Sequence, residues 1–178
     1  NGGIDVIEVT YRSEHATSAI QTISEQLPDM LVGAGTVLSV EQAKEAVEAG
    51  AKFIITPGFN TKVVQWCLDH DVEVYPGVST ASEVEMALSM GLTQLKFFPA
   101  ESSGGAKKLK DLSAPYANVH FMPTGGINTK NMHDYLSLPN VEAIGGSFML
   151  PNDLVVAKDW DGIEALSKSS YQKFVGLP

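Results

Sequence analysis

The segment 31–56, LVGAGTVLSVEQAKEAVEAGAKFIIT, has the pattern of a complete strand–helix–strand unit. It opens with a run of small and β-branched residues at 31–36 and closes with an apolar run at 53–56. Between them, Ser39-Val-Glu-Gln42 has the form of a helix capping box, and Gly50 stands where the helix would end. This order indicates a βαβ unit and therefore a parallel sheet.

Similar units recur along the whole chain. Short β-branched or aromatic runs, which we expect to be strands, occur at 6–10, 31–36, 53–56, 73–75, 95–98, 119–122 and 143–147. They repeat every ~20–27 residues, a period typical of repeated supersecondary units. Helix signals lie between them: Thr80-Ala-Ser-Glu83 is a second capping box, Asn128 precedes another amphipathic segment, and Gly91 marks a helix end. The tail after Trp160 is expected to be a final helix that ends at Gly176.

Two α/β folds fit this alternation, a closed β/α (TIM) barrel and a doubly wound open sheet. No dinucleotide-binding fingerprint follows the first strand, and polar residues recur at the C-terminal ends of the strands, where barrel enzymes keep their active sites. The sequence therefore favours the barrel, as a single domain over 1–178. Such a barrel has about eight units, and seven strand runs are found here. Because Asn1-Gly2-Gly3 also resembles the exit from a helix, we expect the first β/α unit to be missing from the N-terminus.

Composition excludes several classes of protein. The formal net charge of -9 disfavours a non-specific nucleic-acid binder, which needs a basic face. No apolar run is long enough to span a membrane, and no signal peptide is found. Cys67 is the only cysteine, which excludes a disulfide framework and suits the reducing cytoplasm, where we expect the protein to be located.

One lysine and one glutamate are predicted to point into the same confined space. Side chains alternate along a strand, so Leu95 and Phe97 would face the outer helices while Lys96 and Phe98 face the interior. The same alternation in 6–10 turns Glu8 inward. Charged residues are seldom buried without a partner or a function, so the pair is either a structural ion pair or part of a catalytic site.

Arg12 follows the strand that carries Glu8. An arginine at this end of the strand can hold a substrate carboxylate through two parallel hydrogen bonds, and its charge would lower the pKa of a nearby lysine. Arg12 on its own would be interpreted as a solvated loop residue. Together with Glu8 and Lys96 it favours catalysis.

Glycine-rich turns follow the last two predicted strands, at Pro123-Thr-Gly-Gly126 and Gly145-Gly-Ser147. Glycines there let backbone amides approach an anion, and the N-terminus of a following helix favours negative charge. In barrels these two loops are a frequent phosphate site.

Other polar positions at strand ends are ambiguous. Thr36 either offers its hydroxyl to a carboxylate or caps the next helix. Thr56-Pro-Gly58 and Tyr75-Pro-Gly77 are typical of turns, although Pro57 could line a pocket. The histidines show no metal-ligand spacing, so a metal-dependent enzyme is disfavoured; they are His15, His70, His120 and His133.

Six motifs, taken in order, resemble those of the bacterial KDPG/KHG aldolases, which act on 2-keto-3-deoxy-6-phosphogluconate (KDPG) and 4-hydroxy-2-oxoglutarate (KHG). The motifs are Ile7-Glu-Val-Thr-Tyr-Arg12, Gly33-Ala-Gly-Thr-Val37, Thr56-Pro-Gly58, Lys96-Phe-Phe-Pro-Ala-Glu101, Pro123-Thr-Gly-Gly-Ile127 and Gly145-Gly-Ser147. The resemblance covers nearly the whole chain. It implies an eight-stranded β/α barrel, a homotrimer, a phosphorylated 2-keto acid substrate, and no metal or organic cofactor.

The resemblance also implies a role for each site residue. Lys96 would form a Schiff base with the substrate, Glu8 would be the general acid and base, and Arg12 with Thr36 would hold the carboxylate. The remaining substrate contacts would come from Pro57, Phe98 and Thr124, and the phosphate would bind at Gly125, Gly126, Gly146 and Ser147.

The motifs are also compatible with two other activities. Phosphogalactonate aldolases resemble these enzymes but tend to carry an aliphatic residue at the position of Thr124, so Thr124 favours the gluconate substrate. A phosphosugar isomerase or epimerase could use the same barrel with Glu8 as base, and a non-catalytic barrel subunit is a further alternative.

Overall fold

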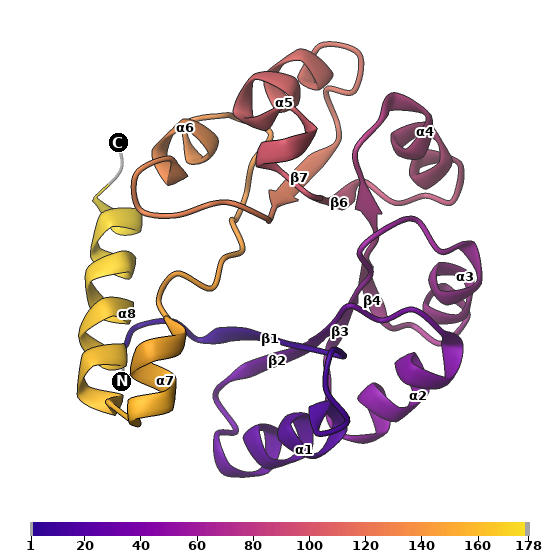
Figure 1. The fold of residues 1–178 in the computed structure, drawn as a ribbon. Helices are drawn as coiled ribbons and strands as arrows, with labels where there is room; N and C mark the ends of the chain where they lie inside the picture. Colours follow the sequence, from indigo (N-terminus) through magenta and orange to yellow (C-terminus); the bar gives the residue numbers. More distant parts are fainter. Residues whose placement is uncertain (1, 177–178) are drawn as a thin grey trace. The chain divides into compact units, whose positions relative to one another are not determined.

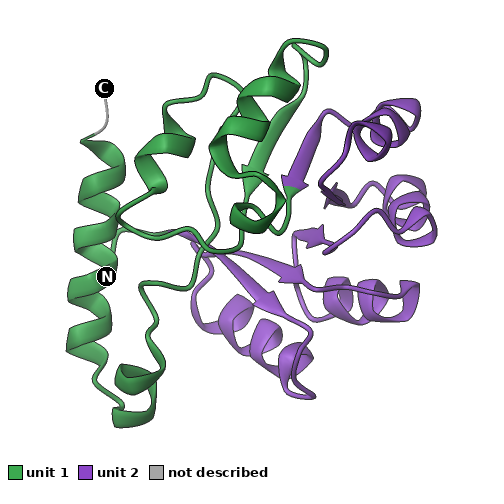
Figure 2. Ribbon diagram, turned by 45° about the horizontal axis from the view of Figure 1, so that its top comes forward, with its two compact units in different colours: residues 1–4, 97–178 green, residues 5–96 purple. Residues whose placement is uncertain are grey.

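The computed structural model describes residues 2–176 of the chain and has an α/β fold. The chain falls into two compact units, one formed by residues 5–96 and the other by residues 97–176 with 2–4 (Figure 2). The expectation of a single domain stays a prediction. Asn1, part of the expected helix exit, lies outside the described residues.

The unit 5–96 contains a four-stranded parallel sheet of order β1-β2-β3-β4. Its strands are β1 (Val6–Thr10), β2 (Leu31–Gly35), β3 (Phe53–Ile55) and β4 (Glu73–Tyr75). Helices follow the strands in turn, and α1 to α3 lie on one side of this sheet (Figure 1). The helices of this unit are α1 (Ala16–Gln26), α2 (Val40–Glu48), α3 (Thr61–Asp69) and α4 (Ala81–Ser89). The predicted strands at 6–10, 31–36, 53–56 and 73–75 are thus confirmed to within a residue.

Local signals set the helix boundaries as the sequence predicts. The Thr80 hydroxyl accepts a hydrogen bond from the Glu83 amide, and the Glu83 carboxylate accepts one from the Thr80 amide, which completes the capping box of α4. Ser39 caps α2 by accepting from the Gln42 amide. Gly50 and Gly91 follow α2 and α4 with φ of 109° and 80°, left-handed values that favour glycine and end each helix.

The core of this unit lies between the parallel sheet and helices α1 to α3. Apolar side chains from both layers are buried in one cluster, among them Ile20, Ala46, Ile54 and Val64. Ile7 and Val9 of β1 pack against this cluster, so the side chain between them, Glu8, faces the opposite side of the sheet.

A second sheet has the order β5-β6-β7, and the boundary between the two units falls within β6. Its strands are β5 (Gly77–Val78), β6 (Gln94–Phe97) and β7 (His120–Pro123). The two-residue strand β5 was not predicted from the sequence. The predicted strands at 95–98 and 119–122 are each found one residue away from the expected position, as β6 and β7.

The second unit is richer in helix than in strand. After β6 it contains η1 (Glu101–Ser103), α5 (Gly105–Ser113), α6 (Met132–Leu136), α7 (Asn152–Ala157) and α8 (Trp160–Val175). The final helix therefore begins at Trp160 and is followed by Gly176, as predicted. None of the helices within residues 2–176 combines the length and apolar character needed to cross a bilayer.

One strand predicted for this unit is absent from the structure. Residues 143–147 form no strand: Gly145 makes one isolated parallel bridge with Thr124, and a second isolated bridge joins Val141, outside this segment, to Phe121. Adjacent glycines offer no side chains to pack on a sheet face, which weakens strand formation. The helix expected after Asn128 is present as α6 and begins at Met132; before it, the Asn128 side chain accepts a hydrogen bond from the Lys130 amide and holds a turn.

Candidate active site

Lys96 and Glu8 form an ion pair within the unit 5–96. Lys96 Nζ lies 3.5 Å from Glu8 Oε1, and the lysine is 5% exposed. Lys96 is on β6, where its backbone amide donates to the Pro76 carbonyl, and Glu8 is on β1. The structure therefore brings together the two side chains that strand alternation turned inward.

Two glycines of β2 let neighbouring side chains lie directly against the strand. A Cβ at Gly35 would lie 1.7 Å from Glu8 Oε1, and a Cβ at Gly33 would lie 2.0 Å from the ring of Phe53. No side chain larger than hydrogen fits at either position unless these neighbours move. This function of Gly35 was not predicted from the sequence, although glycines at alternate positions of a strand are a signal of close approach.

Burial lowers the pKa of Lys96 below its ordinary value of 10.5. Glu8 acts against this shift because its negative charge and hydrogen bond favour the protonated amine, while the positive charge of Arg12 lowers the pKa further. The net direction is downward. More of the amine is therefore neutral at a given pH than in a solvated lysine.

Arg12 is exposed just beyond the end of β1. It makes no ion pair with a carboxylate in the described part of the chain. It also lines a pocket of about 390 Å³. The other residues of this pocket are Tyr11, Ser13, Glu14, Thr17, Gln42 and Glu45.

Thr36 follows β2 and has a φ of 55°, a left-handed conformation that is unusual for a β-branched residue. It does not cap α2, since Ser39 does so. The alternative of a helix-capping Thr36 is therefore wrong. Strained residues of this kind concentrate at functional sites.

Pro57 is half-buried in the turn after β3. Its carbonyl group lies against Gly77, where an added Cβ would be 2.3 Å from the oxygen. The Thr56 hydroxyl donates to the Gly58 carbonyl in the same turn. These contacts fit the expected turn, and a substrate contact from Pro57 stays a prediction.

The loop from Thr124 to Gly126, in the second unit, has all three of its carbonyl oxygens hydrogen-bonded to the protein. The Ala100 amide donates to Thr124 and the Glu101 amide to Gly125, while the side chains of Asn128 and Asn131 donate to Gly126. Gly125 and Gly126 have φ of 99° and 81°, and within residues 2–176 their amides donate to no protein acceptor. Backbone amides left free in this way are suited to bind an anion.

The segment from Gly145 to Ser147 lies beside this loop. The Gly145 amide donates to the Pro123 carbonyl, and a Cβ at Gly145 would lie 2.4 Å from the Thr124 methyl group. Thr124 is 8% exposed, and its hydroxyl has no hydrogen-bond partner among the described residues. Gly146 and Ser147 are exposed.

The helix N-termini expected to follow these two loops directly are not there. α6 begins at Met132 and α7 at Asn152, both several residues past the glycines, because turns occupy the sequence in between. Any anion at Gly126 or Ser147 would therefore be held by loop amides and side chains.

Phe98, the residue after β6, is half-buried next to Gly125, where an added Cβ would be 3.4 Å from its ring. The predicted site residues thus form two sets. The unit 5–96 contains Lys96, Glu8, Arg12, Thr36 and Pro57. The second unit contains Phe98 and the glycine-rich loops.

No group of three or more His, Cys, Asp or Glu side chains close enough to share a metal ion occurs within residues 2–176. The roles assigned to the residues of the ion pair and the loops stay predictions.

Comparison with known proteins identifies the family. A family model described as KDPG and KHG aldolase matches residues 1–166. The 2-dehydro-3-deoxy-phosphogluconate aldolase of Treponema pallidum is 47% identical over 171 residues, which are 96% of this chain and 81% of that protein. The KHG/KDPG aldolase of Escherichia coli K12 is 43% identical over 171 residues, 96% of this chain and 80% of that protein.

A solved structure supports the same family. It is the KDPG aldolase of Legionella pneumophila, with pyruvate captured at low pH as a covalent carbinolamine intermediate. That protein is 40% identical, and the match covers 95% of this chain and 82% of that one with a TM-score of 0.92. The resemblance drawn from the motifs is confirmed: this chain belongs to the KDPG and KHG aldolase family.

Proposed function

We propose that this chain is a class I aldolase that cleaves KDPG to pyruvate and glyceraldehyde 3-phosphate. We extend the proposal to KHG, which would yield pyruvate and glyoxylate. The observation that carries it is Lys96, a buried lysine with a lowered pKa, 3.5 Å from a carboxylate, in a chain of this family.

The first step uses the neutral amine. Lys96 Nζ attacks the C2 carbonyl of the keto acid to form a carbinolamine, and loss of water with proton transfer through Glu8 gives an iminium ion. Arg12 and the Thr36 hydroxyl hold the C1 carboxylate. This positioning aligns the C3–C4 bond with the iminium and can be worth several kcal/mol.

Cleavage follows because the iminium accepts the electrons of the C3–C4 bond. Glu8, through a water molecule, takes the proton of the C4 hydroxyl as that bond breaks. The aldehyde leaves, and an enamine of pyruvate remains on Lys96. Protonation of C3 and addition of water then release pyruvate and restore the amine.

The distal half of the substrate would bind to the second set of residues. The buried, unpartnered hydroxyl of Thr124 is available for a hydrogen bond to a substrate hydroxyl, and Phe98 would contact the carbon chain. The free amides of Gly125 and Gly126, with Gly146 and Ser147, would receive the phosphate. Thr124 also supports the gluconate substrate over the galactonate one.

Fold and assembly complete the proposal. We infer the closed eight-stranded β/α barrel and the homotrimer from the family resemblance, and a cytoplasmic location from the single buried Cys67. The expectation of a β/α unit before Asn1 stays a prediction.

Borohydride trapping tests the proposed chemistry. Incubation with pyruvate and borohydride, followed by peptide mapping, should place a reduced adduct on Lys96. Lys107 is an internal control, since its ion pair with Asp111 raises its pKa and keeps it protonated. A folded protein without an adduct on Lys96, or with the adduct on Lys52 or Lys107, would refute the assignment. An isomerase would give turnover of a sugar phosphate without any adduct.

A further inference from the structure

Tyr135 and Glu101 contact each other next to the Gly125–Gly126 loop, and neither residue has a role in the mechanism proposed above. We propose that they are positioning residues that hold this loop in the conformation that binds the substrate's phosphate, and that they thereby set the preference for phosphorylated over unphosphorylated keto acids. The inference rests on the proposed function of the loop.

Glu101 contacts the loop through both its backbone and its side chain. Its amide donates to the Gly125 carbonyl at 3.1 Å. A Cβ at Gly126 would lie 2.7 Å from Glu101 Cγ, so the side chain lies directly on Gly126. Glu101 therefore constrains the backbone of both glycines, Gly125 through its amide and Gly126 through its side chain.

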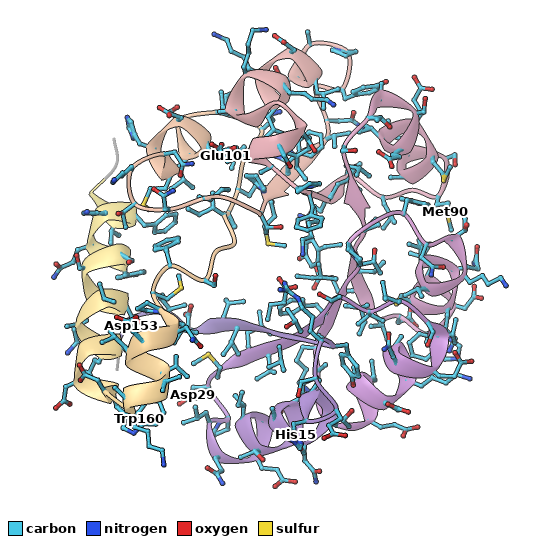
Figure 3. All side chains as sticks on the ribbon, in the orientation of Figure 1. His15, Asp29, Met90, Glu101, Asp153 and Trp160 are labelled. Atoms are coloured by element: carbon cyan, nitrogen blue, oxygen red, sulfur yellow. The ribbon has the colours of Figure 1, made fainter. Side chains whose placement is uncertain are left out.

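Tyr135 fixes the far end of that side chain. It is 1% exposed within α6, and its hydroxyl donates to Glu101 Oε1. Glu101 lies on the side of α5 that faces α6 (Figure 3). Burial and the Glu101 charge raise the pKa of Tyr135, so the phenol remains a hydrogen-bond donor throughout the working pH range.

The start of α6 holds the same loop at a second point. Asn131, which precedes α6, donates through Nδ2 to the Gly126 carbonyl at 3.1 Å. The loop is thus tied to α6 directly through Asn131 and indirectly through Tyr135 and Glu101. Both ties orient its carbonyl groups toward the protein, which leaves the amides of Gly125 and Gly126 for an anion.

The hydrogen bond between Tyr135 and Glu101 also affects the electrostatics of the phosphate site. A carboxylate near a phosphate site opposes binding, because like charges repel. The Tyr135 hydroxyl holds the Glu101 carboxylate next to Gly105, where an added Cβ would be 3.5 Å from Oε1. Without this hydrogen bond, the carboxylate would be free to move toward the phosphate.

The test compares Tyr135→Phe with the wild type on two substrates, KDPG and the unphosphorylated KHG. We expect KM for KDPG to rise about tenfold, as for the loss of a hydrogen bond to a charged group, with kcat nearly unchanged. Both constants for KHG should stay at their wild-type values. Stabilisation by inorganic phosphate in a thermal melt should be lost as well.

Glu101→Gln separates charge from packing. The amide keeps an oxygen that can accept from Tyr135 but carries no charge, so this variant should not raise KM for KDPG. In the Tyr135→Phe background it should restore part of the lost affinity. Tyr116→Phe is the matched control, because it removes the hydroxyl of another buried tyrosine in the same unit. If Tyr135→Phe does not fold, Glu101→Ala should raise KM for KDPG alone.

An equal rise in KM for both substrates, a fall in kcat for both, or an unchanged KM for KDPG would overturn the inference. None of these outcomes affects the proposed function, provided that the wild type forms the Lys96 adduct and cleaves KDPG. A wild-type protein that forms no adduct would instead refute the proposed function itself.

Discussion

The carboxylate of Glu8 lies directly over Gly35: a Cβ at position 35 would be 1.7 Å from Glu8 Oε1. Glu8 is also 3.5 Å from Lys96 Nζ, so the absence of a side chain at 35 lets the carboxylate take its place beside the amine. A glycine in β2 thereby positions a side chain of β1.

Gly35→Ala should displace Glu8 and slow cleavage by about 10²-fold, the size expected when a general acid–base is lost. The measurement is kcat for KDPG, with circular dichroism to verify folding. If the effect acts through Glu8, Gly35→Ala combined with Glu8→Gln should be no slower than Glu8→Gln alone. Gly33→Ala is the matched control. Its added methyl group would lie against the Phe53 ring, so it should lower the melting temperature and leave kcat of the folded enzyme unchanged. Equal loss of kcat in both variants would contradict the prediction.

Trapping of pyruvate should depend on pH with a midpoint below 10.5, because burial lowers the pKa of Lys96. Only the neutral amine attacks, so the trapping rate rises with pH through this midpoint. Arg12→Leu removes a positive charge that lowers the pKa, and should move the midpoint upward. Glu8→Gln removes a negative charge that raises the pKa, and should move it downward. Rates of adduct formation measured over a pH series give the midpoint for each variant. Midpoints that shift in the same direction for both variants would refute this electrostatic account.

Arg12→Lys should raise KM for KDPG and for KHG alike, by about tenfold, because lysine keeps the charge but loses the two parallel hydrogen bonds to the shared C1 carboxylate. Steady-state kinetics on both substrates provide the measurement. Glu14→Gln changes another exposed residue of the same pocket and should leave both KM values unaltered. A rise in KM for only one substrate would show that Arg12 does not bind the common carboxylate.

Cys67 should resist thiol reagents in the native protein. It is completely buried in the core of the unit 5–96, and burial raises its pKa to about 11, so the reactive thiolate is scarce. An aromatic disulfide reagent should titrate one thiol in denaturant and none in buffer, and activity should survive the treatment. Rapid labelling of the folded enzyme would show that this core opens more readily than its packing indicates.

The sequence by itself determined the elements that depend on neighbouring residues. The capping box at Thr80, the helix end at Gly91 and the strand at 6–10 arise from hydrogen bonds and side-chain alternation within a few residues, and the structure contains each of them. Side-chain alternation alone also predicted that Lys96 and Glu8 lie on the inner side of their strands, and the structure pairs them there. The family motifs identified the rest of the candidate site, and those roles await the experiments above.

Only the tertiary structure decided which distant residues meet. Glu101 and Tyr135 are 34 positions apart, and neither carries a local signal of the other. The fit of Glu8 over Gly35 likewise depends on the register of two strands, which packing of the core against the helices fixes. Residues 143–147 have an apolar pattern that predicted a strand, but tertiary packing does not support one there. Two adjacent glycines offer no side chains to pack on a sheet face, and the segment lies as a loop beside Thr124. Local hydrogen bonds are determined by neighbouring residues in the sequence, whereas close packing depends on the whole fold.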